Sequence, residues 1–95
     1  MSQTAFLQDY VEFRCETIGS GPYWQINATY LEPSLESVYR EERGIEILSE
    51  SRTSGVYSSV LQVHAIEINN NTEIRCKPYS GYVMSQPALL KIQGI

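Results

Sequence analysis

The chain has 95 residues, of which 42% are hydrophobic and 19% charged, and its net charge is −4. This length suits a single domain over residues 1–95, because a piece of half the size would bury too little surface to be stable alone. Seven basic residues scattered along an acidic chain form no cationic stripe, so we expect no nucleic-acid partner. No apolar run approaches the roughly 20 residues of a membrane span, so we expect no direct membrane insertion of this domain.

The first four residues, Met-Ser-Gln-Thr, lack the basic start and apolar run of a secretory signal peptide. We interpret Met1 as an expression start placed before an internal boundary. The domain is therefore expected to be one part of a larger protein.

Apolar and polar residues alternate along most of the chain, which predicts half-buried β-strands separated by turns. The expected strands are residues 10–16, 23–27, 45–48, 56–66, 72–77 and 87–93. The residues expected to face the core include Val11, Phe13, Cys15, Trp24, Ile26, Leu61, Val63, Ile74, Cys76, Leu90 and Ile92. Short strands with turn signals every ten or so residues are typical of an antiparallel sandwich.

Residues 33–44 fit this pattern less well. Pro33 near the start, Gly44 at the end and apolar residues between them are helix signals. We nevertheless predict an edge strand with loops, with a short helix as the alternative, because the flanking strands leave this stretch crossing between sheets.

Cys15 and Cys76 could form a disulfide, remain buried thiols or supply half of a metal site. A metal site is disfavoured, because neither cysteine has a second Cys or His at the short spacing of zinc ligands. The only histidine, His64, is separated from Cys76 by eleven residues. We expect no metal and no cofactor.

The arrangement of Cys15, Trp24, Leu61, Val63 and Cys76 resembles the immunoglobulin superfamily, in which a tryptophan packs against a disulfide that joins two sheets. The family's apolar, acidic and tyrosine positions before the second cysteine correspond to Leu61, Val63, Ile66, Asn70 and Ile74, and residues 88–94 look like its last strand. The resemblance implies an all-β, immunoglobulin-like antiparallel β-sandwich with one inter-sheet disulfide. That disulfide would contribute roughly 4 kcal/mol in the chain-entropy model and requires an oxidising compartment.

Three departures from the family pattern predict a divergent member, whose subtype stays open between variable-like, intermediate and short constant-like sets. Ile74 stands where the family usually has the tyrosine of its corner motif, so that hydrogen bond cannot form. Asn70 stands at the acidic position, so an ion pair with Arg43 is lost. Only eight residues separate Cys15 from Trp24, which makes the loop between them short.

We expect no enzyme and no catalytic residue. His64 should lie on the outward face of its strand, without a serine or cysteine motif to accompany it. The carboxylates of Glu41, Glu42 and Glu46 are most simply a charged hairpin.

Two tripeptides, Asn27-Ala28-Thr29 and Asn70-Asn71-Thr72, are N-glycosylation sequons and favour an extracellular location. Asn27 is expected to point outward from a strand and Asn70 to lie in a turn, so both could carry a glycan without disturbing the core. We expect at least one to be occupied.

Two binding surfaces remain open for the sandwich that the resemblance implies. The first is a loop tip carrying Tyr23, Tyr79 and Tyr82, since tyrosines flanked by serine and glycine are typical of binding loops. The second is a sheet face carrying Tyr23, Gln25, Arg75 and Lys77.

By analogy with the family, we expect an extracellular protein–protein recognition module. Its partner would be another cell-surface protein, or the same protein, in cell adhesion or cell–cell recognition. The domain would belong to the ectodomain of a single-pass membrane protein or to a secreted protein. The alternatives are a structural spacer without its own ligand and an accessory domain of an extracellular enzyme.

Overall fold

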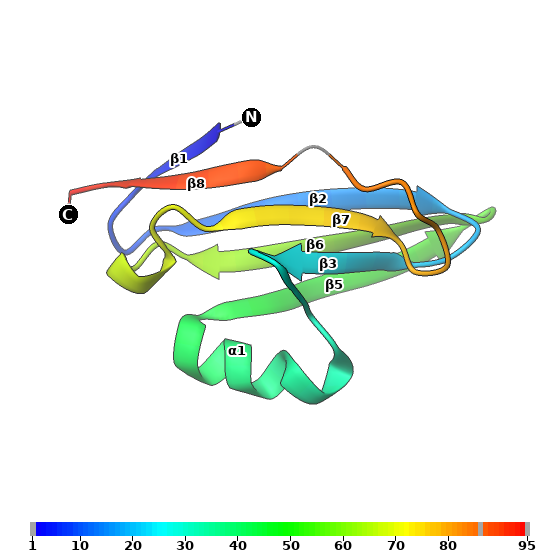
Figure 1. The fold of residues 1–95 in the computed structure, drawn as a ribbon, viewed down its shortest axis with the longest axis horizontal. Helices are drawn as coiled ribbons and strands as arrows, with labels where there is room; N and C mark the ends of the chain where they lie inside the picture. Colours follow the sequence, from blue (N-terminus) through cyan, green and yellow to red (C-terminus); the bar gives the residue numbers. More distant parts are fainter. Residues whose placement is uncertain (1, 86, 95) are drawn as a thin grey trace.

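The computed structural model describes residues 2–85 and 87–94 and consists of two packed β-sheets (Figure 1). The strands are β1 (Ser2–Phe6), β2 (Tyr10–Ile18), β3 (Pro22–Ile26), β4 (Thr29–Tyr30), β5 (Ile45–Thr53), β6 (Val56–His64), β7 (Glu73–Pro78) and β8 (Ala88–Gln93). The helical elements are the 3₁₀ turns η1 (Pro33–Leu35) and η2 (Glu67–Asn69) and the α-helix α1 (Glu36–Arg43).

One sheet has the strand order β1-β8-β7-β3-β4, and the other has the order β2-β6-β5. The second sheet is built on long pairings, which align Tyr10 with His64 and Ile18 with Val56. Among the described residues the strand pairings are antiparallel except that of β1, which runs parallel to β8. The sequence does not predict β1, because of its five residues only Ala5 is buried and no alternation marks it.

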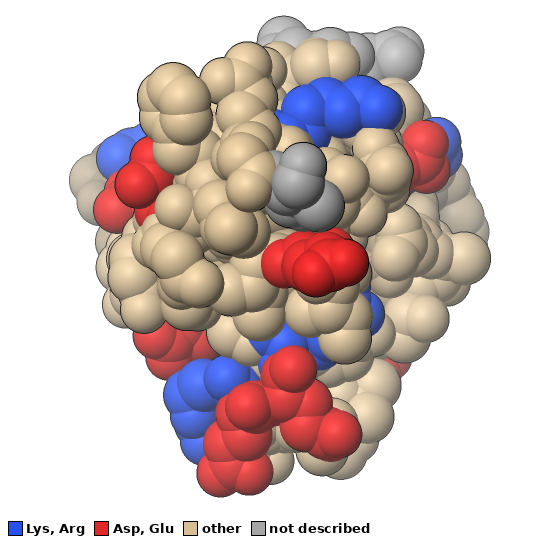
Figure 2. All heavy atoms as spheres, turned by 90° about the vertical axis from the view of Figure 1, so that its left-hand side faces the viewer, with Lys and Arg blue, Asp and Glu red and all other residues tan. Residues whose placement is uncertain are grey.

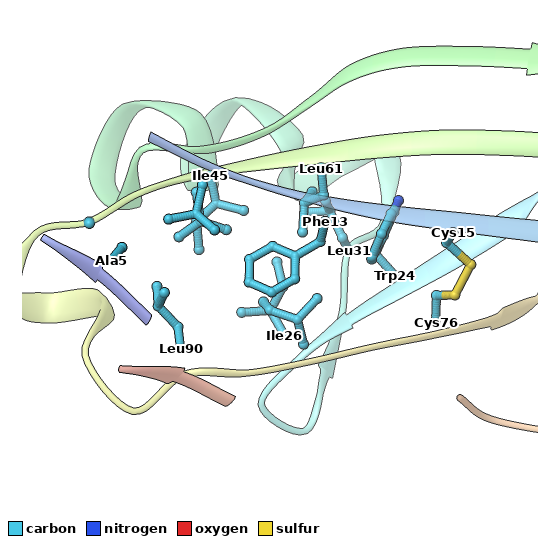
Figure 3. Packing of buried hydrophobic residues seen from close by; sticks show 14 of the residues in the cluster. Ala5, Phe13, Cys15, Trp24, Ile26, Leu31, Ile45, Leu61, Cys76 and Leu90 are labelled. Atoms are coloured by element: carbon cyan, nitrogen blue, oxygen red, sulfur yellow. A yellow bond between two sulfur atoms is a disulfide. The ribbon is translucent and has the colours of Figure 1, made fainter. Parts of the chain in front are cut away.

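The core lies between the two sheets (Figure 3). The alternation read from the sequence is clearest in β2, where every second side chain is buried. The residues predicted for the core are buried as well: Trp24 is 3% exposed, Leu61 and Val63 are 0% exposed and Ile74 is 2% exposed. The sandwich is therefore filled by side chains from both inner faces, as two-sheet packing requires.

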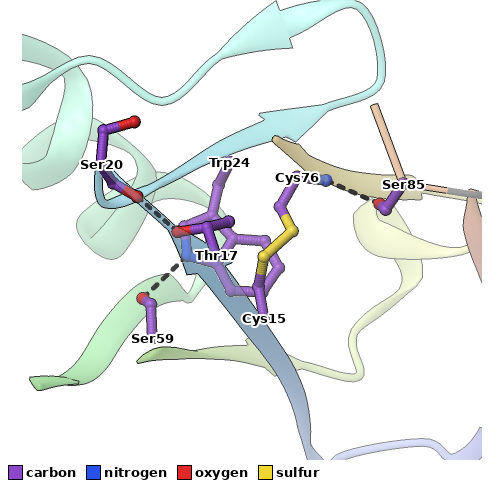
Figure 4. Close-up of a disulfide and its surroundings, with 7 residues drawn as sticks. All are labelled: Cys15, Thr17, Ser20, Trp24, Ser59, Cys76 and Ser85. Atoms are coloured by element: carbon purple, nitrogen blue, oxygen red, sulfur yellow. Dashed lines mark hydrogen bonds between the residues drawn. A yellow bond between two sulfur atoms is a disulfide. The ribbon is translucent and has the colours of Figure 1, made fainter. Parts of the chain in front are cut away.

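The Cys15–Cys76 disulfide joins β2 of one sheet to β7 of the other, which confirms the predicted all-β sandwich with an inter-sheet bridge (Figure 4). Trp24 lies beside the bridge, and its Nε1 donates a hydrogen bond to Ser59 Oγ on β6 at 2.9 Å. Because Ser59 is 1% exposed, this bond satisfies a polar pair that water cannot reach. The bridge closes a separation of 61 residues, worth roughly 4 kcal/mol in the chain-entropy model.

The prediction of an edge strand over residues 33–44 is wrong, because this stretch forms η1 and α1. Pro33 occupies the first turn, where its missing N–H costs nothing, and Gly44 ends the helix in the left-handed region with φ 65°. Leu35 and Tyr39 pack against the core, so the helix covers one side of the sandwich. Pro33 and Gly44 thus begin and end a helical segment, as these residues commonly do. This segment, rather than an edge strand, connects β4 of one sheet to β5 of the other.

Candidate functional site

The outer face of the β8-β7-β3-β4 sheet carries the residues of the predicted sheet-face site. Since Trp24 points into the core, its neighbours Tyr23 and Gln25 point outward. The register of β3 and β7 places Tyr23 opposite Lys77 and Gln25 opposite Arg75. All four side chains are half-buried, so they form a packed surface.

Three tyrosine rings lie together on this face. Tyr23 stacks on Tyr30, with ring centroids 4.3 Å apart and planes at 15°, and its centroid lies 4.8 Å from that of Tyr79 at a tilt of 46°. We call Tyr23, Tyr30 and Tyr79 the tyrosine cluster. It joins β3, β4 and the loop after β7, so the predicted sheet-face and loop-tip sites meet in one surface. The sequence missed Tyr30, because the two-residue strand β4 is too short to show a pattern.

Lys77 fixes the loop that carries Tyr79. Its Nζ donates to the carbonyl oxygens of Pro78, Tyr79 and Gly81 at 3.3, 3.1 and 2.9 Å. The same ammonium lies 5.1 Å from the ring centroid of Tyr23, within cation–π range. The loop is thus held against the sheet before any partner arrives, which lowers the entropy lost on binding.

Glu32 completes the cluster from the segment after β4. The hydroxyl of Tyr23 donates a hydrogen bond to Glu32 Oε1. This bond, followed by burial and by the charge of Glu32, raises the pKa of Tyr23 to about 12. The hydrogen bond to the carboxylate also holds the Tyr23 ring in its orientation.

No protein-family model and no curated protein matches this chain.

Tyr82 is placed apart from the cluster. It projects from the loop between β7 and β8 with 98% of its surface exposed, and Val83 beside it is 83% exposed. Val83 and Ile18, which is 78% exposed, line a shallow groove of about 380 Å³ next to the disulfide. Both loop-tip tyrosines are thus exposed, but Tyr79, at 62%, contacts the ring of Tyr23, whereas Tyr82 lies outside the cluster.

The two sequon asparagines lie at the ends of β3 and β7 opposite to Tyr23 and Tyr79, whereas Tyr30 of the cluster directly follows the Asn27 sequon. Asn27 follows the last residue of β3 and Asn70 precedes β7, whereas Tyr23 is near the start of β3 and Tyr79 follows β7 (Figure 1). Asn27 was expected on a strand, but it lies in the β3–β4 turn with φ 55° and is exposed. Asn70 is half-buried and accepts a hydrogen bond from Ile92 N at 3.0 Å.

Arg43 makes a network that the sequence did not predict. The ion pair with position 70 is absent, as expected, but the neighbouring Asn69 takes its place by accepting from Arg43 Nε at 2.9 Å. Asn69 Nδ2 in turn donates to the carbonyl oxygens of Arg43 and His64 at 2.6 and 2.7 Å. This buried amide ties α1 to the end of β6.

In the part of the chain that the structure describes, the side chains that could take part in catalysis or metal binding do not come together in one place. His64 is half-buried and stacks on Tyr10, with ring centroids 4.4 Å apart. Among the residues described, no group of three or more His, Cys, Asp or Glu side chains is placed to hold a metal ion. Within the same residues, no helix has the length and apolar character to cross a membrane.

Charged side chains of both signs are interspersed at the end of the molecule shown in Figure 2. Acidic side chains gather next to basic ones at the lower side, at the level of α1, and further charges are scattered above. Helix α1 itself alternates Glu36, Arg40, Glu41, Glu42 and Arg43. Such a mixture is typical of a solvated surface.

Proposed function

We propose that this domain is an extracellular protein-recognition module that binds another cell-surface protein through the tyrosine cluster. The observation that carries the proposal is the preordered contact of three tyrosine rings, two stacked and one tilted, of which Tyr23 and Tyr79 lie at the ends of β3 and β7 opposite to both sequons. Tyrosine rings give large contact areas for little lost side-chain entropy. Gln25 and Arg75 lie next to the cluster and supply a polar rim.

We also propose that the domain is a divergent member of the immunoglobulin superfamily. The sheet orders β8-β7-β3-β4 and β2-β6-β5 correspond to the family's G-F-C-C′ and B-E-D sheets. The disulfide joins the strands that correspond to B and F, and Trp24 lies on the strand that corresponds to C. These correspondences support the sequence resemblance over nearly the whole chain.

The disulfide indicates an oxidising compartment. Together with the sequons, it supports placing the domain in the ectodomain of a single-pass membrane protein or in a secreted protein. In either setting the domain would serve adhesion or cell–cell recognition, with the same protein or a different one as partner. A spacer domain without its own ligand is the alternative that the test below separates.

The test is a bead assay. Beads coated with the domain are mixed with beads carrying the same domain and with an array of recombinant cell-surface ectodomains. The expected result is binding to at least one of them. Truncating Tyr79 to Ala should weaken it by about 2 kcal/mol, or roughly 30-fold, as for a central aromatic anchor.

Tyr82→Ala is the matched control, because it removes the same side chain from the same loop but outside the cluster. Both variants must keep wild-type thermal unfolding for the comparison to count. Equal loss in the two variants, or none in either, would reject the cluster as the contact surface. If the intact domain binds nothing, the spacer function replaces recognition.

A further inference from the structure

Strand β5 has a free edge. Within residues 2–85 and 87–94 it pairs only with β6, and α1 lies beside its first half, while no described strand pairs with the outer side of its second half (Figure 1). The register with β6 shifts between Ile47 and Ser49, and from Ser49 to Thr53 the pairing is regular and all five side chains are exposed. This stretch therefore presents a row of backbone groups that another strand could pair with.

The β5–β6 turn determines which of those backbone groups are free. Ser54 and Gly55 have φ values of 51° and 79°, as a two-residue type I′ turn requires. In such a turn the flanking pair, Thr53 and Val56, is hydrogen-bonded, and bonded and non-bonded pairs alternate from there. The backbone N–H and C=O groups of Ser51 then form hydrogen bonds with β6. Those of Glu50 and Arg52 point away from β6, toward the free edge.

We propose that a second copy of this chain pairs with this edge, antiparallel and centred on Ser51. In this register Glu50 of each copy lies opposite Arg52 of the other, so the free backbone groups of both residues meet and two opposite-charge pairs form. Shifting the register by two residues either way would place Glu50 opposite Glu50 or Arg52 opposite Arg52. Charge thus selects one register from those that the backbone allows.

The side chains at the axis suit this pairing. Ser51 is small, so its two copies can approach closely at the two-fold axis. The guanidinium of Arg52 lies 5.3 Å from the ring centroid of Tyr57 on β6, on the side of β5 away from the free edge, so it would turn across the strand to meet Glu50 of the other copy. Ile45 lies six residues before Ser51, whereas the turn of the other copy begins three residues after it, at Ser54, so each copy's α1 would lie beyond the other's turn.

The proposed dimer has a consequence for recognition. A two-fold axis that relates antiparallel neighbours of one sheet is perpendicular to that sheet, so β2-β6-β5 would continue into its copy as six strands. Both tyrosine clusters would then lie on the same side of the dimer. The pairing is small and therefore weak in solution, but it would present the proposed recognition surface twice and raise its avidity.

Cysteine cross-linking tests the register. Ser51 would face its own copy as a non-hydrogen-bonded pair, with Cα atoms about 4.5 Å apart, close enough for a disulfide. Ser51→Cys should therefore give a covalent dimer under mild oxidation, seen on a non-reducing gel. Ser49→Cys is the matched control, because this exposed serine of the same strand would face Thr53 and should stay monomeric. Equal cross-linking of both, or of neither, would overturn the proposal.

Charge reversal tests the pairing independently of cysteine chemistry. Sedimentation equilibrium of the wild-type domain at concentrations up to about 1 mM should show a monomer–dimer equilibrium, since small interfaces are weak. Glu50→Arg alone and Arg52→Glu alone should each weaken it by about tenfold or more, because every pair becomes like-charged. The two single variants mixed together, and the doubly reversed chain, should regain association.

Monomers at every concentration, or single variants that dimerise like the wild type, would overturn the proposal. The outcome is separable from the proposed function, on which it does not rest. Tyr79→Ala should leave dimerisation unchanged while it weakens partner binding, and Glu50→Arg should lower the avidity of the coated beads without removing binding by a single domain.

Discussion

Replacing Asn69 by Asp tests the hydrogen bonds that hold Arg43. The family pattern places its acidic residue at position 70, but in the structure Asn69 contacts Arg43 instead. A carboxylate at position 69 could pair with Arg43, yet the structure predicts that it destabilises the domain. The amide nitrogen of Asn69 donates to two carbonyl oxygens, of Arg43 and His64, and a carboxylate has no hydrogen to offer them.

The magnitude follows from these contacts. Each lost hydrogen bond is worth about 1 kcal/mol net, and the two carbonyl oxygens would instead face a negative oxygen. Asn69 is 0% exposed, so the new carboxylate also loses its hydration, which attraction to Arg43 at best offsets. We expect Asn69→Asp to lower the free energy of unfolding by about 2–4 kcal/mol.

Urea unfolding followed by tryptophan fluorescence measures this loss. With a slope of about 2 kcal/mol per molar urea, the midpoint should fall by roughly 1–2 M. Asn70→Asp is the control, because it makes the same chemical change one residue away, where the side chain is half-buried and acts as an acceptor toward Ile92 N. It should shift the midpoint little. Equal or greater stability of Asn69→Asp than of the wild type would refute the reasoning.

Trp24→Ala should lower the free energy of unfolding by about 3–5 kcal/mol, because it removes a large side chain that is 3% exposed; a loss below about 1 kcal/mol in urea titration would contradict this packing. Tyr23 should ionise near its pKa of about 12, and Glu32→Gln should lower that pKa toward 10 in a titration of tyrosinate absorbance. Because its folded pKa is raised, the Tyr23–Glu32 bond adds stability below pH 10 that is lost between about pH 10 and 12. A wild-type titration in which every tyrosine ionises near pH 10 would contradict this bond.

The two-sheet fold was predictable because alternation leaves one apolar face on each strand. In β2 the period of two is uninterrupted, and burial follows it at every residue. β1 and β4 lack such a signal. Their places are set by pairing with β8 and β3, and pairing across the chain leaves little trace in a segment of two to five residues.

The candidate site was predictable only in part, for a related reason. Strand alternation places Tyr23, Gln25 and Arg75 outward, and the structure has them there. What alternation cannot give is the contact of Tyr23 with Tyr79, because that contact depends on how the loop after β7 folds back. Lys77 determines the fold of that loop by donating to three of its carbonyl oxygens, a role that its position on a strand does not reveal.

Asn70 is both the residue that differs from the acidic position of the family pattern and the first residue of a sequon. In the family pattern an acidic side chain at this position would anchor an arginine, and an acidic side chain cannot accept an N-linked glycan. Here η2 ends at Asn69 and turns that residue inward, where it bonds Arg43, so anchoring no longer requires position 70. The side-chain oxygen of Asn70 accepts a hydrogen bond from Ile92 N. An N-linked glycan is attached to the amide nitrogen, so this hydrogen bond does not use the atom that would carry the glycan. Because Asn69, and not residue 70, holds Arg43, a sequon asparagine at position 70 is compatible with the fold.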